Sequence, residues 1–528
     1  MGLESDTTDS RLAWFSRLLG LGFIAHVIQA VARSVMTTGG LGAAEFFRQA
    51  ELYAWTPGLF PPNGINLLVN WFLFTLLAVC LMLGMRSKWI FSLLLAVAIS
   101  HFFALPFRVS NHYLMCVWSI GLLAMLPLVL RKSPSDTVNR TLIVLLRHLM
   151  CITYFFAVLH KLNTSFLSPE TTSLKVVVPP VLFDFAGLVG LENGGFKNGM
   201  FTVLIYATLL TELALPFLLV YKRTRIAGWL LGLIFHGLIT YLAGVSDYTI
   251  VILSFYILFL DRDDREILWE TFRTCRCSKV FVAVASALVL ESLPLFIGTG
   301  LPSFPDRFTF VAWLIEYLTS LSVLTMTGYC LIAWTPLLFT GRRQSASVTA
   351  PATEVKKISF WRSMPTGVVA IIVVLDLAYL MNGFSPYLGL KYFYSQAMYS
   401  NLQTDSTGSN HLFLPHIGLF QNDVFVRISL LEFTPPVSDE ELRNNRGLQL
   451  LLESKDQSLV EKNFLVAVLG NACRKSEHNV SIRMMEIRSG VTMKEKELTC
   501  TDLEKMHSRP LNFYPWFIQS EAAASKDR

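Results

Sequence analysis

Charged residues are scarce in this chain. Asp, Glu, Lys and Arg make up only 16% of its 528 residues, whereas 53% are hydrophobic, and the mean hydropathy is +0.49. Soluble domains carry about 25% charged residues. The shortage of charge therefore excludes an ordinary soluble or disordered protein and predicts a multispan membrane protein. The net charge of +6 therefore does not indicate a nucleic-acid partner. The basic residues are better interpreted as topology signals on short loops.

Several catalytic signatures are also missing from the sequence. There is no Gly-rich phosphate loop, no nucleophile elbow and no His/Cys cluster with metal-ligand spacing. Kinase, serine hydrolase and zinc protease activities are therefore not supported, and no metal is inferred. An inverted repeat of the kind found in transporters is not evident either.

Apolar runs of about 20 residues, the length that a helix needs to cross about 30 Å of hydrocarbon, recur along the chain. They predict an all-α bundle of about eleven membrane spans. These spans are residues 15–36, 65–84, 89–108, 112–130, 141–161, 199–221, 224–244, 247–260, 279–299, 309–338 and 366–384.

The basic residues orient this bundle, because they cluster in alternate loops and short cytoplasmic loops are enriched in Lys and Arg. We therefore expect the N-terminal tail, residues 1–14, to be cytoplasmic. An odd number of spans then places the C-terminus outside, in the ER lumen of a eukaryote or the periplasm or exterior of a bacterium. The clusters include Arg86/Lys88, Arg131/Lys132, Lys222/Arg223/Arg225 and Arg342/Arg343.

The composition changes after the last span. Residues 263–385 are predicted to hold further membrane helices and a cytoplasmic linker at 340–362. Residues 386–528 contain alternating stretches such as "VSIRMMEIRSGV" and are expected to form a small α+β extracytoplasmic domain. Because Cys473 and Cys500 are the only cysteines in that domain, they are expected to form a disulfide in an oxidising compartment. Asn479, in an Asn-x-Ser sequon, is a candidate glycosylation site.

Ionisable side chains inside the spans are the natural site candidates, because each costs roughly 2.5 to 3.5 kcal/mol to place in hydrocarbon. In the fifth span, five residues from Arg147 to Lys161 share one helix face within about 80°. Lys161 lies at the outer end, where the positive-inside rule gives no reason for a lysine; the alternative is that its long amine extends to the membrane interface. The five residues are Arg147, Cys151, Tyr154, Val158 and Lys161.

Four further residues are candidates in other positions. Glu212 and His236 lie at similar estimated depths on helices joined by a tight turn, which predicts a Glu–His hydrogen bond. His160 lies about 100° round the axis from Lys161 and need not share its pocket. His112 begins the fourth span on the outer side. The alternative for each is a helix–helix hydrogen bond without chemistry.

The stretch "YFFAVLHKLN", residues 154–163, resembles the Tyr-Phe-x-Ala and Lys-Leu signature of the HTTM (horizontally transferred transmembrane) domain family, relatives of the vitamin K-dependent γ-carboxylase. Other motifs occur in the family's order, and the resemblance covers roughly residues 11–262, which includes the predicted core domain 15–262. These motifs are "RLAWFSRLLGLGFI", "LYAWTPGLFPP", "SNHYLM", "TELALPFLL" and "GLIFHGLITYL".

The resemblance implies a carbon–carbon lyase chemistry. In the carboxylase a lysine at the position of Lys161 acts as a base on reduced vitamin K, whose oxygenation supplies a strong base that removes the γ proton of a protein glutamate before carbon dioxide adds. His112 matches a family histidine, whereas His160 and Asn163 stand where the carboxylase has a lysine and an aspartate. The implied cofactor is reduced vitamin K or another lipid quinone.

Two functions therefore stay open. The first is an enzyme that modifies a secreted or membrane polypeptide at the outer face of the bilayer. The second is a non-enzymatic membrane module that binds lipid or a partner protein.

Overall fold

The computed structural model describes most of the N-terminal half of the chain and parts of the remainder. The described residues are 2–37, 64–104, 111–177, 194–243, 245–274, a few positions between 325 and 331, 365–388, and, with gaps, 400–417 and 425–519.

Nine of the predicted spans coincide with helices of the described part. The predicted spans 279–299 and 309–338 lie outside it, apart from the few positions in the second. Helix α1 begins at Gly2 and so includes the expected tail. The nine helices are α1 (Gly2–Thr37), α3 (Gly64–Met82), α4 (Lys88–Ala104), α5 (Asn111–Val129), α6 (Ser135–Lys161), α10 (Gly194–Val220), α11 (Arg225–Ala243), α12 (Ser246–Phe259) and α18 (Thr366–Phe384).

Length and composition confirm that this is a helical membrane protein. Within the described residues, four segments are long and apolar enough to cross a bilayer: Ser10–Gln29, Ser135–Lys161, Asn198–Val220 and Thr366–Phe384. Five further helices contribute shorter apolar segments of 10 to 17 residues: Val69–Met82, Lys88–Ser100, Tyr113–Val129, Arg225–Thr240 and Ser246–Phe259.

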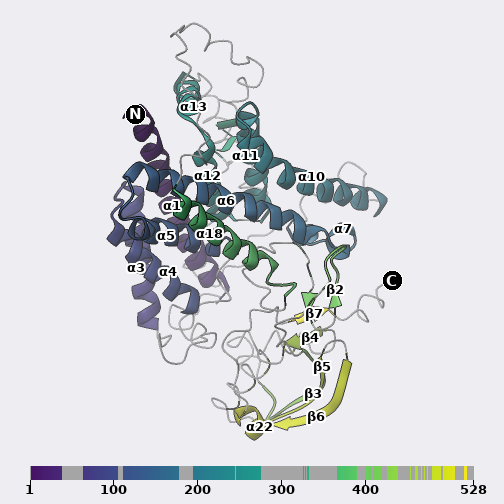
Figure 1. The fold of residues 1–528 in the computed structure, drawn as a ribbon. Helices are drawn as coiled ribbons and strands as arrows, with labels where there is room; N and C mark the ends of the chain where they lie inside the picture. The colour runs from purple at the N-terminus through teal and green to yellow at the C-terminus, as the bar shows by residue number, and fades with distance from the viewer. Residues whose placement is uncertain are drawn as a thin grey trace.

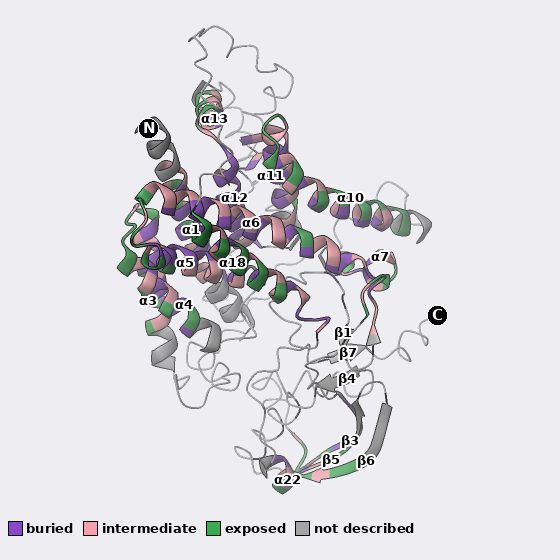
Figure 2. Cartoon of the chain, viewed as in Figure 1, coloured by how far each residue is buried: buried purple, intermediate pink, exposed green. Residues whose placement is uncertain are grey.

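Helix α6 is the central element of the bundle. It packs against α1, α5, α10, α12 and α18, and it lies in the middle of the helices in Figure 1. Its inward side chains, such as Leu146 and Met150, are fully buried. Large apolar side chains on the outer faces, such as Phe72 and Phe217, are about two-thirds exposed, and Figure 2 shows exposed residues along the outer side of α10. Outward apolar faces of this kind are expected where lipid replaces water.

Polar contacts join the helices inside this apolar bundle. Each member lies on a different helix from its partner, so the contacts fix which helices are neighbours. They are His26 Nδ1 to Asp247 Oδ2 at 2.8 Å (α1 to α12), His148 Nδ1 to Asp376 Oδ2 at 2.6 Å (α6 to α18), and Arg147 Nε and Nη2 to the carbonyl oxygen of Leu258 at 2.9 and 2.5 Å (α6 to α12).

Short helices follow two of the long ones. Helices α7 (Thr164–Leu167) and α8 (Leu174–Val177) come after α6, and α13 (Arg262–Thr274) comes after α12. Arg225, at the start of α11, binds Asp264 Oδ2 at 2.7 Å and so links α11 to the beginning of α13.

The C-terminal region contains an antiparallel five-stranded sheet of order β6-β5-β3-β4-β7. Along β5, Val480, Ile482 and Met484 are buried while Arg483 is exposed, which is the two-residue alternation of a strand with one face on a core. The elements are β3 (Phe425–Thr434), β4 (Ser458–Glu461), β5 (Asn479–Arg488), β6 (Val491–Thr499), β7 (Phe517–Gln519) and the helix α22 (Cys500–Lys505).

The disulfide predicted in this region is confirmed. Cys473 and Cys500 are bonded, with their Cα atoms 5.5 Å apart. Asn479 is exposed at the first position of β5. A separate two-stranded hairpin, β1 (Thr404–Asp405) with β2 (Gly408–Ser409), precedes the sheet and lies beside α7 in Figure 1.

Candidate functional site

Lys161, the last residue of α6, is buried, with 4% of its surface exposed. Its Nζ lies 2.9 Å from both Glu212 carboxylate oxygens and 3.3 Å from the carbonyl oxygen of Ala157. These three acceptors match the three hydrogens of an ammonium group. The lysine therefore turns into the bundle instead of extending to the membrane interface.

Glu212 comes from α10 and corrects one prediction. Its side chain is also buried, and the ion pair with Lys161 joins α10 to the end of α6. The Glu212–His236 hydrogen bond expected from their similar depths does not form, because Glu212 binds Lys161 and His236 binds Tyr154. A carboxylate and an ammonium in apolar surroundings need each other, since an isolated buried charge costs several kcal/mol.

An apolar cluster forms one wall of this ion pair. Phe166, Ile205 and Leu209 pack together, and the first two are fully buried. The Phe166 ring centroid is 5.9 Å from Lys161 Nζ, within the range of a cation–π contact. The charged pair therefore lies beside an apolar cluster.

A second polar group lies about two turns before Lys161 on the same face of α6, or about 10 Å along the axis. The Tyr154 hydroxyl is 2.6 Å from His236 Nε2 and 2.6 Å from the Tyr256 hydroxyl. All three side chains are buried, and His236 Nδ1 has no hydrogen-bond partner in the described part of the chain. The arrangement is a hydrogen-bonded chain joining α6, α11 and α12.

Asn163 organises the end of α6. It is fully buried, its Oδ1 accepts from the Phe166 backbone N–H at 2.8 Å, and its Nδ2 donates to the carbonyl oxygens of His160 at 2.7 Å and Ser400 at 2.5 Å. One side chain thus ends α6 and caps the N-terminus of α7. In the sequence Asn163 is visible only as part of a sequon and as a departure from the carboxylase pattern.

His160 lies on a different side of α6 from Lys161. It is fully buried, and its Nε2 is 3.0 Å from the carbonyl oxygen of Gly383 at the end of α18. Its ring contacts those of Phe156 and Tyr387. The structure therefore separates His160 from the Lys161–Glu212 pair.

The side chain of His112 lies outside the described residues; its backbone is in the first turn of α5.

Two pairs between helices were not predicted from the sequence, His26 with Asp247 and His148 with Asp376. The second pair joins the middle of α6 to the middle of α18. The two side chains meet because α18 packs against α6, and their shared depth near the middle of both helices is the only signal that could have paired them.

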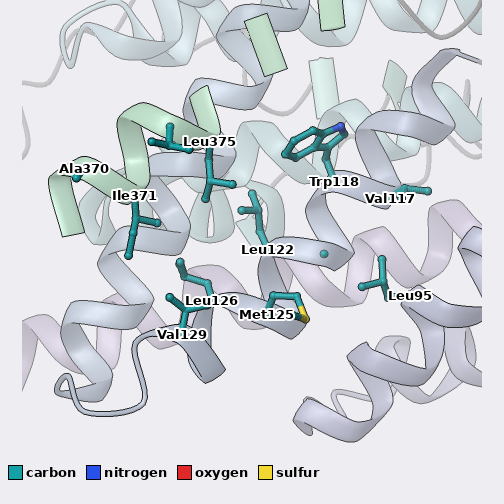
Figure 3. A pocket seen from close by; sticks show the side chains of 12 residues that line it. Leu95, Val117, Trp118, Leu122, Met125, Leu126, Val129, Ala370, Ile371 and Leu375 are labelled. Atoms are coloured by element: carbon teal, nitrogen blue, oxygen red, sulfur yellow. The ribbon is translucent and has the colours of Figure 1, made fainter. Parts of the chain in front are cut away.

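An apolar groove of about 550 Å³ lies between α4, α5 and α18. Figure 3 shows its lining side chains, among them Trp118, Leu122 and Met125 of α5 facing Ile371 and Leu375 of α18. The lining residues do not include any from α6 or α10, so this groove is separate from the Lys161–Glu212 pair.

Comparison with known proteins bears on the helical half of the chain. The family model of the HTTM domain matches residues 5–263, a range that contains Tyr154, Lys161, Glu212 and His236. No curated protein and no solved structure matches the chain. The resemblance carried by the sequence motifs is confirmed: residues 5–263 form an HTTM domain, and the protein is a membrane protein related to the carboxylase family.

Proposed function

We propose that this protein is a lipid-dependent enzyme that modifies glutamate side chains of polypeptides at the outer membrane face. One observation carries the proposal: the family-matched lysine, Lys161, is buried and paired with Glu212 at the end of α6. A lysine that served only as an interfacial anchor would extend toward the headgroups.

The proposal includes a topology of about eleven spans with a cytoplasmic N-terminus and an extracytoplasmic C-terminal domain. The alternating basic loops support this orientation. The Cys473–Cys500 disulfide supports it independently, because structural disulfides persist in oxidising compartments.

The residues around Lys161 fit a reduced lipid quinone as cofactor. Phe166, Ile205 and Leu209 supply an apolar wall, and the ion pair supplies a proton donor and acceptor beside it. Once bound and oxygenated, such a quinone would supply the strong base that removes the γ proton of a substrate glutamate.

Lys161 and Glu212 would act together on a proton. To serve as a base, Lys161 must first lose a proton, and the Glu212 carboxylate at 2.9 Å is the acceptor in place. Moving the proton from Nζ to the carboxylate converts a charge pair into two neutral groups, so the net charge of the site stays zero. The neutral amine can then accept a proton from an acidic ligand hydroxyl.

The test is incorporation of labelled bicarbonate into glutamyl peptides by the full chain in nanodiscs with reduced vitamin K. We expect incorporation by the native protein, its loss in Lys161→Ala, and its retention in Lys175→Ala, which removes an exposed lysine that follows α6. If folded native protein incorporates no labelled bicarbonate into any of a varied set of peptides, the proposal is wrong.

The second candidate is a non-enzymatic module that binds lipid or a polypeptide. The observation in its favour is that all three Nζ hydrogens have acceptors within the protein, as in a purely structural ion pair. In that case peptide or lipid binding would persist in Lys161→Ala without any turnover.

A further inference from the structure

Ser400 and residues 409–414, here together called the clamp, bind the C-terminal end of α6. The Leu412 N–H donates to the carbonyl oxygen of Leu162 at 3.0 Å, and the Thr164 N–H donates to that of Asn410 at 3.0 Å. Ser400 supplies the carbonyl oxygen that accepts from Asn163. The clamp lies outside the matched residues 5–263.

These hydrogen bonds involve residues on both sides of Lys161. The last carbonyls of an α-helix have no partner within the helix. Here the carbonyls of Leu159 and Leu162 receive bonds from the clamp, and that of His160 receives one from Asn163. Lys161 lies between these positions, so the clamp fixes the backbone from which its side chain reaches Glu212.

His411 is the central residue of the clamp and is 8% exposed. Its Nε2 lies 2.8 Å from the carbonyl oxygen of Leu159, and its Nδ1 lies 3.0 and 2.9 Å from the backbone N–H groups of Phe413 and Leu414. Because a carbonyl can only accept and an N–H can only donate, Nε2 carries the proton and Nδ1 keeps its lone pair. This pattern requires a neutral imidazole; a proton on Nδ1 would face two N–H donors.

We propose that His411 is a positioning residue, which holds the end of α6 and therefore Lys161 in place only while its imidazole is neutral. Acidification of the extracytoplasmic compartment then releases the clamp. The proposal deepens the proposed function, but its test measures structure and needs no activity.

The surroundings of His411 support release of the clamp at low pH. Burial lowers the pKa of His411 below its ordinary 6.5, against a smaller raising effect of the bond to Leu159. Because the pKa of His411 is lower in the closed clamp than in the open state, His411 stabilises the closed clamp fully above about pH 6.5. This stabilisation is lost as the pH falls. Among the described residues, the nearby titratable groups are Tyr387, with its ring 5.4 Å away, His160, which also contacts Tyr387, and Lys161, which is directed at Glu212.

Hydrogen exchange of the full chain in nanodiscs tests the release. Protection factors of the Thr164 and Leu412 amides, corrected for intrinsic exchange rates, are compared at pH 7.5 and pH 5.5. One linked proton with a pKa of 6.5 in the open state raises the opening constant by at most about tenfold between these pH values. We therefore expect a loss of protection in the native chain that does not exceed about tenfold. His411→Gln, which keeps a neutral donor and acceptor, should show none.

Lysine acetylation tests the positioning. At pH 7.5, His411→Ala should increase the labelling of Lys161 relative to exposed Lys175, and His411→Gln should not. Unchanged protection of the native chain between the two pH values, or an equal loss in His411→Gln, overturns the pH dependence. Unchanged Lys161 labelling in His411→Ala overturns the positioning role. The pH series on the native chain requires no variant, so misfolding of His411→Ala leaves the pH dependence falsifiable.

Discussion

The Glu212→Gln substitution isolates the charge of the central ion pair. Glutamine keeps the shape of the side chain and removes its negative charge. The side chains of Lys161 and Glu212 are only 5% and 9% exposed, and the adjacent cluster of Phe166, Ile205 and Leu209 offers no polar atom to replace the carboxylate. The variant therefore leaves an ammonium buried without a counterion.

Breaking a buried ion pair by removing one partner costs about 3 to 5 kcal/mol of unfolding free energy. We expect Glu212→Gln to fall in this range. The double variant Lys161→Met with Glu212→Gln removes both charges and conserves volume, so its loss should be smaller than the sum of the two single losses. The difference measures the coupling of the pair.

Unfolding in mixed micelles titrated with dodecyl sulfate measures these free energies, with the buried free cysteines Cys116 and Cys330 as thiol-labelling reporters. Asp136→Asn is the matched control, because it removes a carboxylate from an ion pair on the same helix whose members are 36% and 35% exposed. Such a pair contributes at most about 1 kcal/mol. A loss for Glu212→Gln no larger than that of the control would refute the argument that the pair is desolvated.

Three further predictions concern packing, the disulfide and glycosylation. Gly383→Ala places a methyl group against the fully buried Phe156 ring of α6 and should lower the free energy of unfolding by about 1 to 3 kcal/mol. Gly367→Ala in the same helix places its methyl group in open space and should lower it far less. Thermal unfolding of the two variants measures the difference. Cys473→Ser removes a crosslink spanning 27 residues and should destabilise the C-terminal domain by about 3 kcal/mol, measured by its susceptibility to limited proteolysis. In a eukaryotic host, glycopeptide mass spectrometry should find a glycan on exposed Asn479 and none on Asn163, which is fully buried with its amide nitrogen bound.

The positions of the membrane helices were predictable because each span carries its own local signal of length and hydropathy. The inward direction of Lys161 was predictable from spacing alone, since the i+3/i+4 stripe of α6 includes Tyr154 and Arg147, which also bind neighbouring helices. Both inferences need only one helix at a time.

The partner of Glu212 was not predictable in the same way, because it depends on how two helices slide against each other. Counting along the apolar run placed Glu212 near the middle of its span and Lys161 at the end of another. In the structure α10 begins at Gly194, and 18 residues, or about 27 Å of helix, separate that start from Glu212. Helix α10 therefore continues past the level of Lys161, and the two charges meet.

The two departures from the carboxylase pattern, His160 and Asn163, share a structural feature. His160 binds the carbonyl oxygen of Gly383, and Asn163 binds that of Ser400; both partners lie outside residues 5–263, which match the HTTM domain. Lys161 binds Glu212, which lies inside that range. His160 and Asn163 therefore each have a partner outside the matched domain, whereas Lys161 is paired inside it. A carboxylate at residue 163 would face the carbonyl oxygens of His160 and Ser400 with no N–H to donate, so the clamp of this protein requires the amide that it has.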